Sequence, residues 1–221
     1  MCPALPGTPR LAELFAAPRD VAALGFALAQ LPREAGRSGP VLWVQDRMAA
    51  LETGRPCGQS CAGFGLPPGQ LLLACARTAA EVLWTMEEGL RCASLSAIIG
   101  EVWGDPRALG FTATKRLAMR AERQGVHVFL VRFGGAAHLS AARERWRVRS
   151  LPSSPHPYDP KAPGSPRWQA ELFKGRGMRP GMWEAGYDRA AHRLHLVPAL
   201  RNGAMAVAAG PASPAGLAVS R

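Results

Sequence analysis

Residues 95–133 read LSAIIGEVWGDPRALGFTATKRLAMRAERQGVHVFLVRF, and this stretch decides the fold class. An apolar run from Leu95 to Val102 is followed by a helical pattern from Thr112 to Arg123, which Gly125 ends. A run rich in Val and Phe then extends from Val126 to Phe133. Strand, helix and strand in this order, with strands that are apolar almost throughout, predict parallel strands buried on both faces.

The same alternation continues toward the N-terminus. Val41–Val44 follows a Ser-Gly-Pro turn signal and is predicted to be a buried strand, and Leu71–Ala76 is a second apolar run. A loop rich in Gly, Pro and Cys is expected at 53–69, between these strands. Thr78–Arg91 is the clearest helix, because Thr78 and Glu81 have the spacing of a capping box. We therefore predict an α/β protein.

The first thirty residues carry weaker signals. Residues 1–9 contain three prolines and are expected to be disordered, and Arg10–Ala16 is interpreted as a short helical turn. Val21–Leu31 has apolar residues at helical spacing, with Asp20 as its expected N-cap. On this interpretation no strand precedes the first helix.

After Arg143 the pattern changes to short strand-like segments separated by Pro- and Gly-rich turns, which predict antiparallel hairpins. These segments are Trp146–Leu151, Trp168–Lys174, Met182–Tyr187 and Leu194–Val197, with an exposed loop at 152–166. The predicted division is a disordered N-terminus (1–9), an α/β core (10–145), a hairpin extension (146–202) and a disordered tail (203–221).

Basic residues are concentrated in the last third of the chain. Residues 1–140 contain 14 Lys and Arg against 11 Asp and Glu, whereas residues 141–221 contain 13 against 5. Most of the formal net charge of +11 therefore belongs to the C-terminal segment. This asymmetry favours a nucleic-acid or acidic-protein partner on that side, although ordinary solvated arginines would give the same count.

Several segments, taken in order, resemble the ImuA family of accessory proteins in bacterial damage-induced mutagenesis. They are 39–44 (GPVLWV), 71–73 (LLL), 82–91 (VLWTMEEGLR), 100–106 (GEVWGDP) and 112–117 (TATKRL), and the segments 146–148 (WRV) and 168–172 (WQAEL) look like that family's C-terminal hairpins. The resemblance covers residues 18–200. It implies a RecA-like fold, in which a mostly parallel sheet covered by helices on both faces is followed by an antiparallel hairpin extension.

The resemblance also implies a function. It is that of a non-catalytic accessory protein of SOS-induced, error-prone translesion DNA synthesis. The implied partners are an ImuB-like relative of Y-family polymerases, an error-prone C-family DNA polymerase, and RecA together with the DNA backbone. Because the family also resembles SulA, the alternative is a SulA-like cell-division inhibitor that acts on FtsZ. The expected location is the cytoplasm, at the nucleoid during the damage response.

A nucleotide-binding loop is the feature that the sequence lacks. Such a loop needs a Gly-rich turn, a Lys and a Ser or Thr. In a RecA-like fold it precedes the first core helix, where residues 15–20 read FAAPRD, and no lysine occurs before Lys115. Asp20 would also repel phosphate at the helix start. We therefore predict no ATPase activity and no cofactor, and interpret Glu101 as a degenerate Walker-B position.

Candidate binding residues come from two basic stripes and one tryptophan. Alternation along the strand predicted at 146–151 places Arg145, Arg147 and Arg149 on one face, where they could contact phosphates or an acidic protein. Lys115, Arg116 and Arg120 form a similar stripe on the helix predicted at 112–123, and Trp103 lies in a turn at the end of a strand. Each set also has a purely structural interpretation, as solvated charge or as a cover for the sheet end.

Metal and membrane binding are not expected. Cys57 and Cys61 could form a zinc site only with the distant His192 and His195, at a spacing unlike that of common zinc ribbons. No apolar run is long enough to span a bilayer, and no signal-peptide pattern is present.

Trp43 and Trp84 occur in apolar contexts and are expected in the core.

Overall fold

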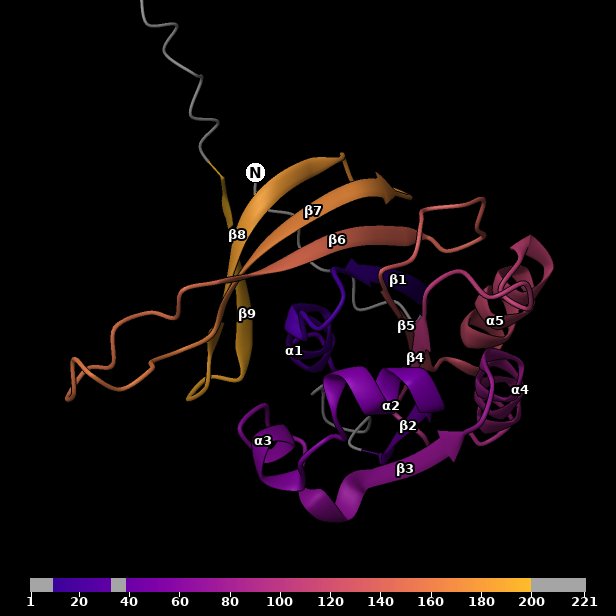
Figure 1. Cartoon of the computed structure of the whole chain (residues 1–221), viewed down its shortest axis with the longest axis horizontal. Coiled ribbons are helices and arrows are strands. Elements are labelled where there is room, and N and C mark those ends of the chain that lie inside the picture. The colour runs from indigo at the N-terminus through magenta and orange to yellow at the C-terminus, as the bar shows by residue number, and fades with distance from the viewer. Residues whose placement is uncertain (1–9, 33–38, 200–221) are drawn as a thin grey trace, which may run out of the picture.

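The computed structural model describes residues 10–32 and 39–199, which form one nine-stranded sheet with helices on both faces of its first part (Figure 1). The strand order is β3-β2-β4-β5-β1-β6-β7-β8-β9. The elements are β1 (Leu11–Ala16), α1 (Ala22–Leu28), β2 (Val41–Asp46), α2 (Arg47–Thr53), α3 (Gly58–Ala62), a 3-10 turn (Pro68–Gln70), β3 (Leu71–Ala76), α4 (Ala79–Gly89), β4 (Ala97–Trp103), α5 (Phe111–Gln124), β5 (His127–Phe133), β6 (Glu144–Leu151), β7 (Arg167–Gly175), β8 (Gly181–Asp188) and β9 (Arg193–Pro198). The tails predicted at 1–9 and 203–221 lie outside the described residues.

The parallel part of the sheet confirms the predicted α/β class. Strands β3, β2, β4, β5, β1 and β6 pair in parallel, in that order. The predicted start of α4 and the predicted end of α5 are confirmed by their caps, whereas α4 ends at Gly89 and α5 begins at Phe111. The hydroxyl of Thr78 accepts a hydrogen bond from the Glu81 N–H at 3.2 Å, and Gly125 ends α5 with a left-handed φ of 71°.

The predicted helical turn at Arg10–Ala16 is wrong. This segment contains β1, which lies between β5 and β6 and is buried along its whole length. The expectation that the chain lacks a strand before its first helix is therefore wrong as well. Glu13 interrupts the apolar run in the sequence, but in the fold its carboxylate faces the buried guanidinium of Arg145 at 2.6 Å. An ion pair made across strands thus lets a charged residue occupy a central strand.

Two smaller corrections concern helices. The helix predicted at Val21–Leu31 is shorter, and its N-cap is Val21 instead of the predicted Asp20. The side chain of Asp20 still accepts a hydrogen bond from the Ala22 N–H at 3.0 Å. The loop predicted at 53–69 contains α3 and a 3-10 turn, and α2 begins directly after β2. Asp46 caps α2, because its carboxylate accepts a hydrogen bond from the Ala49 N–H at 2.6 Å.

The predicted antiparallel extension is confirmed as a continuation of the same sheet. Strands β6 to β9 pair with their neighbours in antiparallel register, and β6 joins the parallel part by pairing with β1. In Figure 1 these strands curve away from α4 and α5. One face of the extension packs on α1. Within the described residues, no helix covers the other face of the extension.

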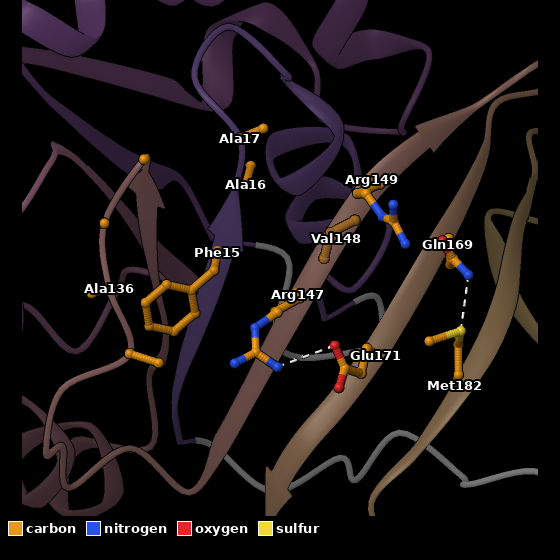
Figure 2. Close-up of a pocket in the computed structure, with 13 residues that line it drawn as sticks. Phe15, Ala16, Ala17, Ala136, Arg147, Val148, Arg149, Gln169, Glu171 and Met182 are labelled. Atoms are coloured by element: carbon orange, nitrogen blue, oxygen red, sulfur yellow. Dashed lines mark hydrogen bonds and ion pairs between the residues drawn. The ribbon is translucent and has the colours of Figure 1, made fainter.

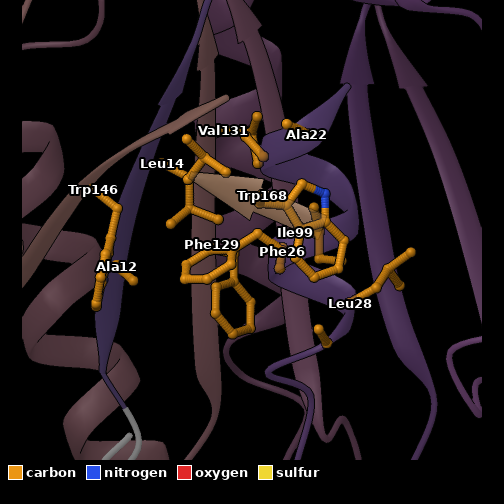
Figure 3. Packing of buried hydrophobic residues seen from close by; sticks show 14 of the residues in the cluster. Ala12, Leu14, Ala22, Phe26, Leu28, Ile99, Phe129, Val131, Trp146 and Trp168 are labelled. Atoms are coloured by element: carbon orange, nitrogen blue, oxygen red, sulfur yellow. The ribbon is translucent and has the colours of Figure 1, made fainter. Parts of the chain in front are cut away.

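Two hydrophobic clusters fill the space between the sheet and its helices. The larger lies on the α1 side, where Phe26 contacts Trp146 and Trp168 at centroid distances of 5.4 and 6.2 Å (Figure 3). The smaller lies beneath α4 and α5. Trp43 is buried as expected, but Trp84 is 65% exposed, so its predicted core position is wrong. Helix α4 buries the opposite side, on which Val82 and Met86 lie.

Candidate functional site: a cationic cleft in the sheet face

A cleft of about 500 Å³ lies where the parallel strands meet the antiparallel extension (Figure 2). Its walls come from the end of β1, the loop after β5, and the open faces of β6, β7 and β8. The lining residues are Phe15, Ala16, Ala17, Gly134, Gly135, Ala136, Ala137, Arg147, Val148, Arg149, Gln169, Glu171 and Met182. The carboxyl ends of parallel strands are the usual location of binding sites in α/β sheets.

Small residues create the space on one wall of the cleft. The loop after β5 consists of glycines and alanines from Gly134 to Ala137, and the chain leaves β1 through Ala16 and Ala17. Gly134 has a φ of 66°, and a Cβ on Gly135 would lie 2.8 Å from the Gly104 carbonyl oxygen. Both positions therefore require glycine.

Asp105 fixes the position of this loop. Its carboxylate accepts hydrogen bonds from the Ala136 N–H at 2.9 and 3.0 Å and from the guanidinium of Arg132, which is buried in β5. Burial lowers the pKa of Arg132, and the negative charges of Glu13 and Asp105 oppose that shift. The wall of the cleft is thus anchored by a charge-assisted contact between the ends of neighbouring strands.

Arginines and phenylalanines alternate across the sheet beside the cleft, and of these residues Phe15 and Arg147 line it. The Phe15 ring lies between the guanidinium groups of Arg132 and Arg145, at 5.1 and 5.2 Å from its centroid. The Phe173 ring lies between those of Arg145 and Arg147, at 5.1 and 4.2 Å. These cation–π contacts arrange the arginines of β5 and β6 and the phenylalanines of β1 and β7 in one row.

The three arginines of β6 have different roles. Arg145 is buried and paired with Glu13, so its charge is already neutralised within the sheet. Arg147 is half exposed and contacts Glu171 at 3.2 Å, as Figure 2 shows. Arg149 is exposed, and within the described residues no ion pair or hydrogen bond holds its side chain. The cleft therefore presents two accessible cations, of which Arg149 has the freer side chain.

The structure does not bring the α5 residues to the cleft. Arg116 and Arg120 contact Glu87 on α4, at 2.9 and 3.4 Å, and so join the two helices. Lys115 is exposed and has no ion pair in the part of the chain that the structure describes. Trp103 is partly buried against Phe133, with ring centroids 6.1 Å apart, and covers the end of the sheet.

Glu101 lies inside the sheet, away from the cleft. Its side chain is fully buried and accepts hydrogen bonds from the Trp43 indole, from Gln45 at 2.9 Å and from Thr53 at 3.4 Å. Burial raises its pKa to about 7, although these hydrogen bonds oppose the shift. Within the described residues, no group of three or more His, Cys, Asp and Glu side chains is placed to hold a metal ion.

Sequence reasoning missed most of the cleft. Of its lining residues, only Arg147 and Arg149 were candidates. Recognising β1 as a strand would have identified Phe15 to Ala17, because the ends of parallel strands meet at one edge of a sheet. The contributions of Gln169 and Met182 depend on strand registers that the sequence does not display.

Fold and cleft define a class: an α/β protein whose parallel sheet continues into antiparallel strands and which has a cleft lined by two arginines at the junction. No protein-family model matches the chain. The chain is similar to the protein ImuA of Caulobacter vibrioides, in strains NA1000 / CB15N and CB 15, with 32% identity over 169 residues in each case. The aligned region is 72% of this chain and 65% of each relative, so the chain spans slightly less than two thirds of the relatives' length. This similarity supports membership of the ImuA family. None of the described helices is long and apolar enough to cross a membrane.

Proposed function

We propose that this chain is a non-catalytic accessory protein of damage-induced, error-prone translesion synthesis. The observation that carries the proposal is the 32% identity to ImuA over 72% of the chain. In this role it bridges an ImuB-like polymerase relative, an error-prone C-family polymerase, and RecA on DNA, in the cytoplasm at the nucleoid. The strand order, with a parallel core that continues into antiparallel strands, supports a RecA-like assignment of the fold.

The cleft supports a binding role. Arg147 and Arg149 lie beside the apolar surfaces of Phe15, Val148 and Met182, a combination that suits an acidic protein segment with apolar side chains. Charged arginines next to aromatic and methionine side chains are enriched at protein interfaces. We assign the ImuB-like partner to this surface.

The loop between β1 and α1 supports the absence of nucleotide hydrolysis. Where a phosphate would be held, the Asp20 carboxylate accepts hydrogen bonds from the Ala22 N–H and from Ser150, whose hydroxyl lies 2.6 Å away. Arg19 is directed to Glu52 at 2.8 Å. The amide that would face an anion is thus already paired with a carboxylate, which repels phosphate.

The proposal is tested by deleting the gene and measuring damage-induced mutation to rifampicin resistance. We expect mutation frequency after ultraviolet exposure to fall to the uninduced level, wild-type protein to restore it, and an equally abundant Arg147→Glu/Arg149→Glu protein to leave it low. Undiminished induced mutation in the deletion strain would refute the proposal.

Filamentation of cells on overexpression, without an effect on mutation, would instead indicate a SulA-like action on FtsZ. ATP turnover that Glu101→Gln abolishes would refute the non-catalytic assignment.

A further inference from the structure

Strand β3 forms one edge of the sheet, at the opposite end from the antiparallel extension. It pairs with β2 in continuous register from Leu71 to Ala76, and the sequence LLLACA contains no charge and no proline. Leu72 is 48% and Leu73 39% exposed, and Cys75 is exposed as well. Edge strands are normally protected from pairing by charges, prolines or bulges. β3 has none of these, so its outer side is open to another strand.

The surface beside β3 is apolar on the side of α2. Met48 and Leu51 project from that helix with 46% and 68% exposure. The register that pairs Trp43 with Leu73 places Leu73 on the same side of the sheet as α2. An extended segment added to β3 would therefore cover apolar side chains with every second residue.

A cationic cavity of about 340 Å³ lies where β2 and β3 end. Its lining comprises Gln45, Asp46, Arg47, Ala50, Leu51, Arg55, Cys75, Ala76 and Arg77. Arg47 and Arg55 are exposed, and neither has an ion pair within the described residues; Arg77 contacts Glu81 at 3.7 Å on the surface. The carboxylate of Asp46 is engaged by backbone N–H groups at Ala49 and Trp103. The cavity thus has an apolar wall and a cationic rim.

We propose that the β3 edge binds an extended segment of a partner protein, which adds a strand to the sheet and places an acidic side chain in the cavity rimmed by Arg47, Arg55 and Arg77. Backbone hydrogen bonds to β3 supply affinity, as in other cases of strand addition. The apolar residues of the segment cover Leu73 and Leu51. The arginines select for the acidic residue at the end that lies beside Ala76, because charge-assisted pairs are stronger than neutral ones.

A second copy of this chain does not fit this edge. Residues 67–80, which contain β3 and its flanks, include no Asp or Glu, so a second β3 would bring no acidic group to the arginines. Each copy also carries a formal net charge of +11, which opposes self-association. Charge complementarity therefore points to a different protein with an acidic end to its strand.

The test uses two fluorescein-labelled peptides of four Val-Thr repeats, one ending in two glutamates and the other in two glutamines. By fluorescence anisotropy we expect the acidic peptide to bind at least about tenfold more tightly, a preference that Arg55→Glu removes. Leu73→Lys should abolish binding of both peptides. Hydrogen exchange should show protection at residues 71–76 when the acidic peptide is present.

Matched variants make the result specific. Leu139→Lys changes a leucine that is 76% exposed in the loop after β5, and Arg123→Glu reverses an exposed charge on α5; both should bind like the wild type. Equal binding of the two peptides would overturn the proposal, and so would binding that Leu73→Lys leaves intact. The proposal would also be overturned if the chain without peptide were a dimer and its residues 71–76 were already protected from hydrogen exchange. That result would assign the β3 edge to a second copy of the chain.

Discussion

Glu13 and Glu101 are both fully buried, but the fold accommodates their charges differently. Glu13 faces the guanidinium of Arg145, so burial of each charge is offset by the other. Glu101 accepts hydrogen bonds from neutral donors, among them Trp43 and Gln45. Desolvation therefore dominates and raises its pKa to about 7. The sequence showed two acids within apolar runs but not which of them has a cation beside it.

The raised pKa of Glu101 predicts a pH-dependent stability. The folded protein holds the proton up to about pH 7, whereas the unfolded chain releases it near the ordinary value of 4.5. This contribution to stability is therefore complete below the unfolded pKa and is lost as pH rises through the folded pKa. The shift corresponds to about 3 kcal/mol. In urea unfolding followed by tryptophan fluorescence, Glu101→Gln should gain about this much free energy of unfolding relative to wild type between pH 4.5 and about pH 8.

The control for this experiment is Glu88→Gln, which changes a partly exposed carboxyl on α4. Its free energy of unfolding should follow that of the wild type across the same pH range. Parallel pH curves for wild type and Glu101→Gln would show that the buried carboxyl does not titrate in this range.

At the scale of elements, the sequence predicted the strands and helices that have a local pattern of hydrophobicity or capping. It missed features that depend on contacts with neighbouring elements. Strands β2 to β5 were found because they are continuous apolar runs, and α4 and α5 because their caps are local. β1 was missed because Glu13 interrupts it and because Leu11, Leu14 and Phe15 have helical spacing. The predicted core position of Trp84 was wrong because the hydrophobicity of a single residue does not show which side of a helix faces the sheet.

The contact between α1 and β7 predicts the effect of one glycine. A Cβ on Gly25 would lie 2.8 Å from Cζ2 of Trp168. Gly25→Ala should gain up to about 1 kcal/mol of helix propensity. It should lose about 1–3 kcal/mol through overpacking, so we expect a net loss of stability in thermal or urea unfolding.

Two variants separate these effects. Gly69→Ala introduces a methyl group where no atom lies within 4 Å, and it should not destabilise the protein. In a Trp168→Phe background the smaller ring removes part of the overlap, so Gly25→Ala should cost less there than in the wild type. A cost that is independent of residue 168 would contradict the proposed packing.

At the scale of the whole molecule, the two proposed binding surfaces lie at opposite ends of one sheet. The cleft combines residues 15–17, 134–137 and 147–149 with Gln169, Glu171 and Met182, which only the strand order β5-β1-β6-β7-β8 brings together. No local pattern indicates such a site. The sequence correctly indicated an excess of basic residues in the last third, but the structure shows Arg145 and Arg167 paired with Glu13 and Glu184. The surface that remains for a partner is therefore smaller than the charge count suggests.

The most direct test of the account is the affinity of the purified chain for the ImuB-like protein that we propose as its partner, measured by biolayer interferometry. We predict a complex that Arg147→Glu/Arg149→Glu weakens at least about tenfold, because both accessible cations of the cleft are reversed. The comparison variant Lys115→Glu/Arg123→Glu makes the same change in charge on α5 and should bind like the wild type. The absence of a complex with wild-type protein, or an equal loss of affinity in the two variants, would contradict the assignment of the partner to the cleft.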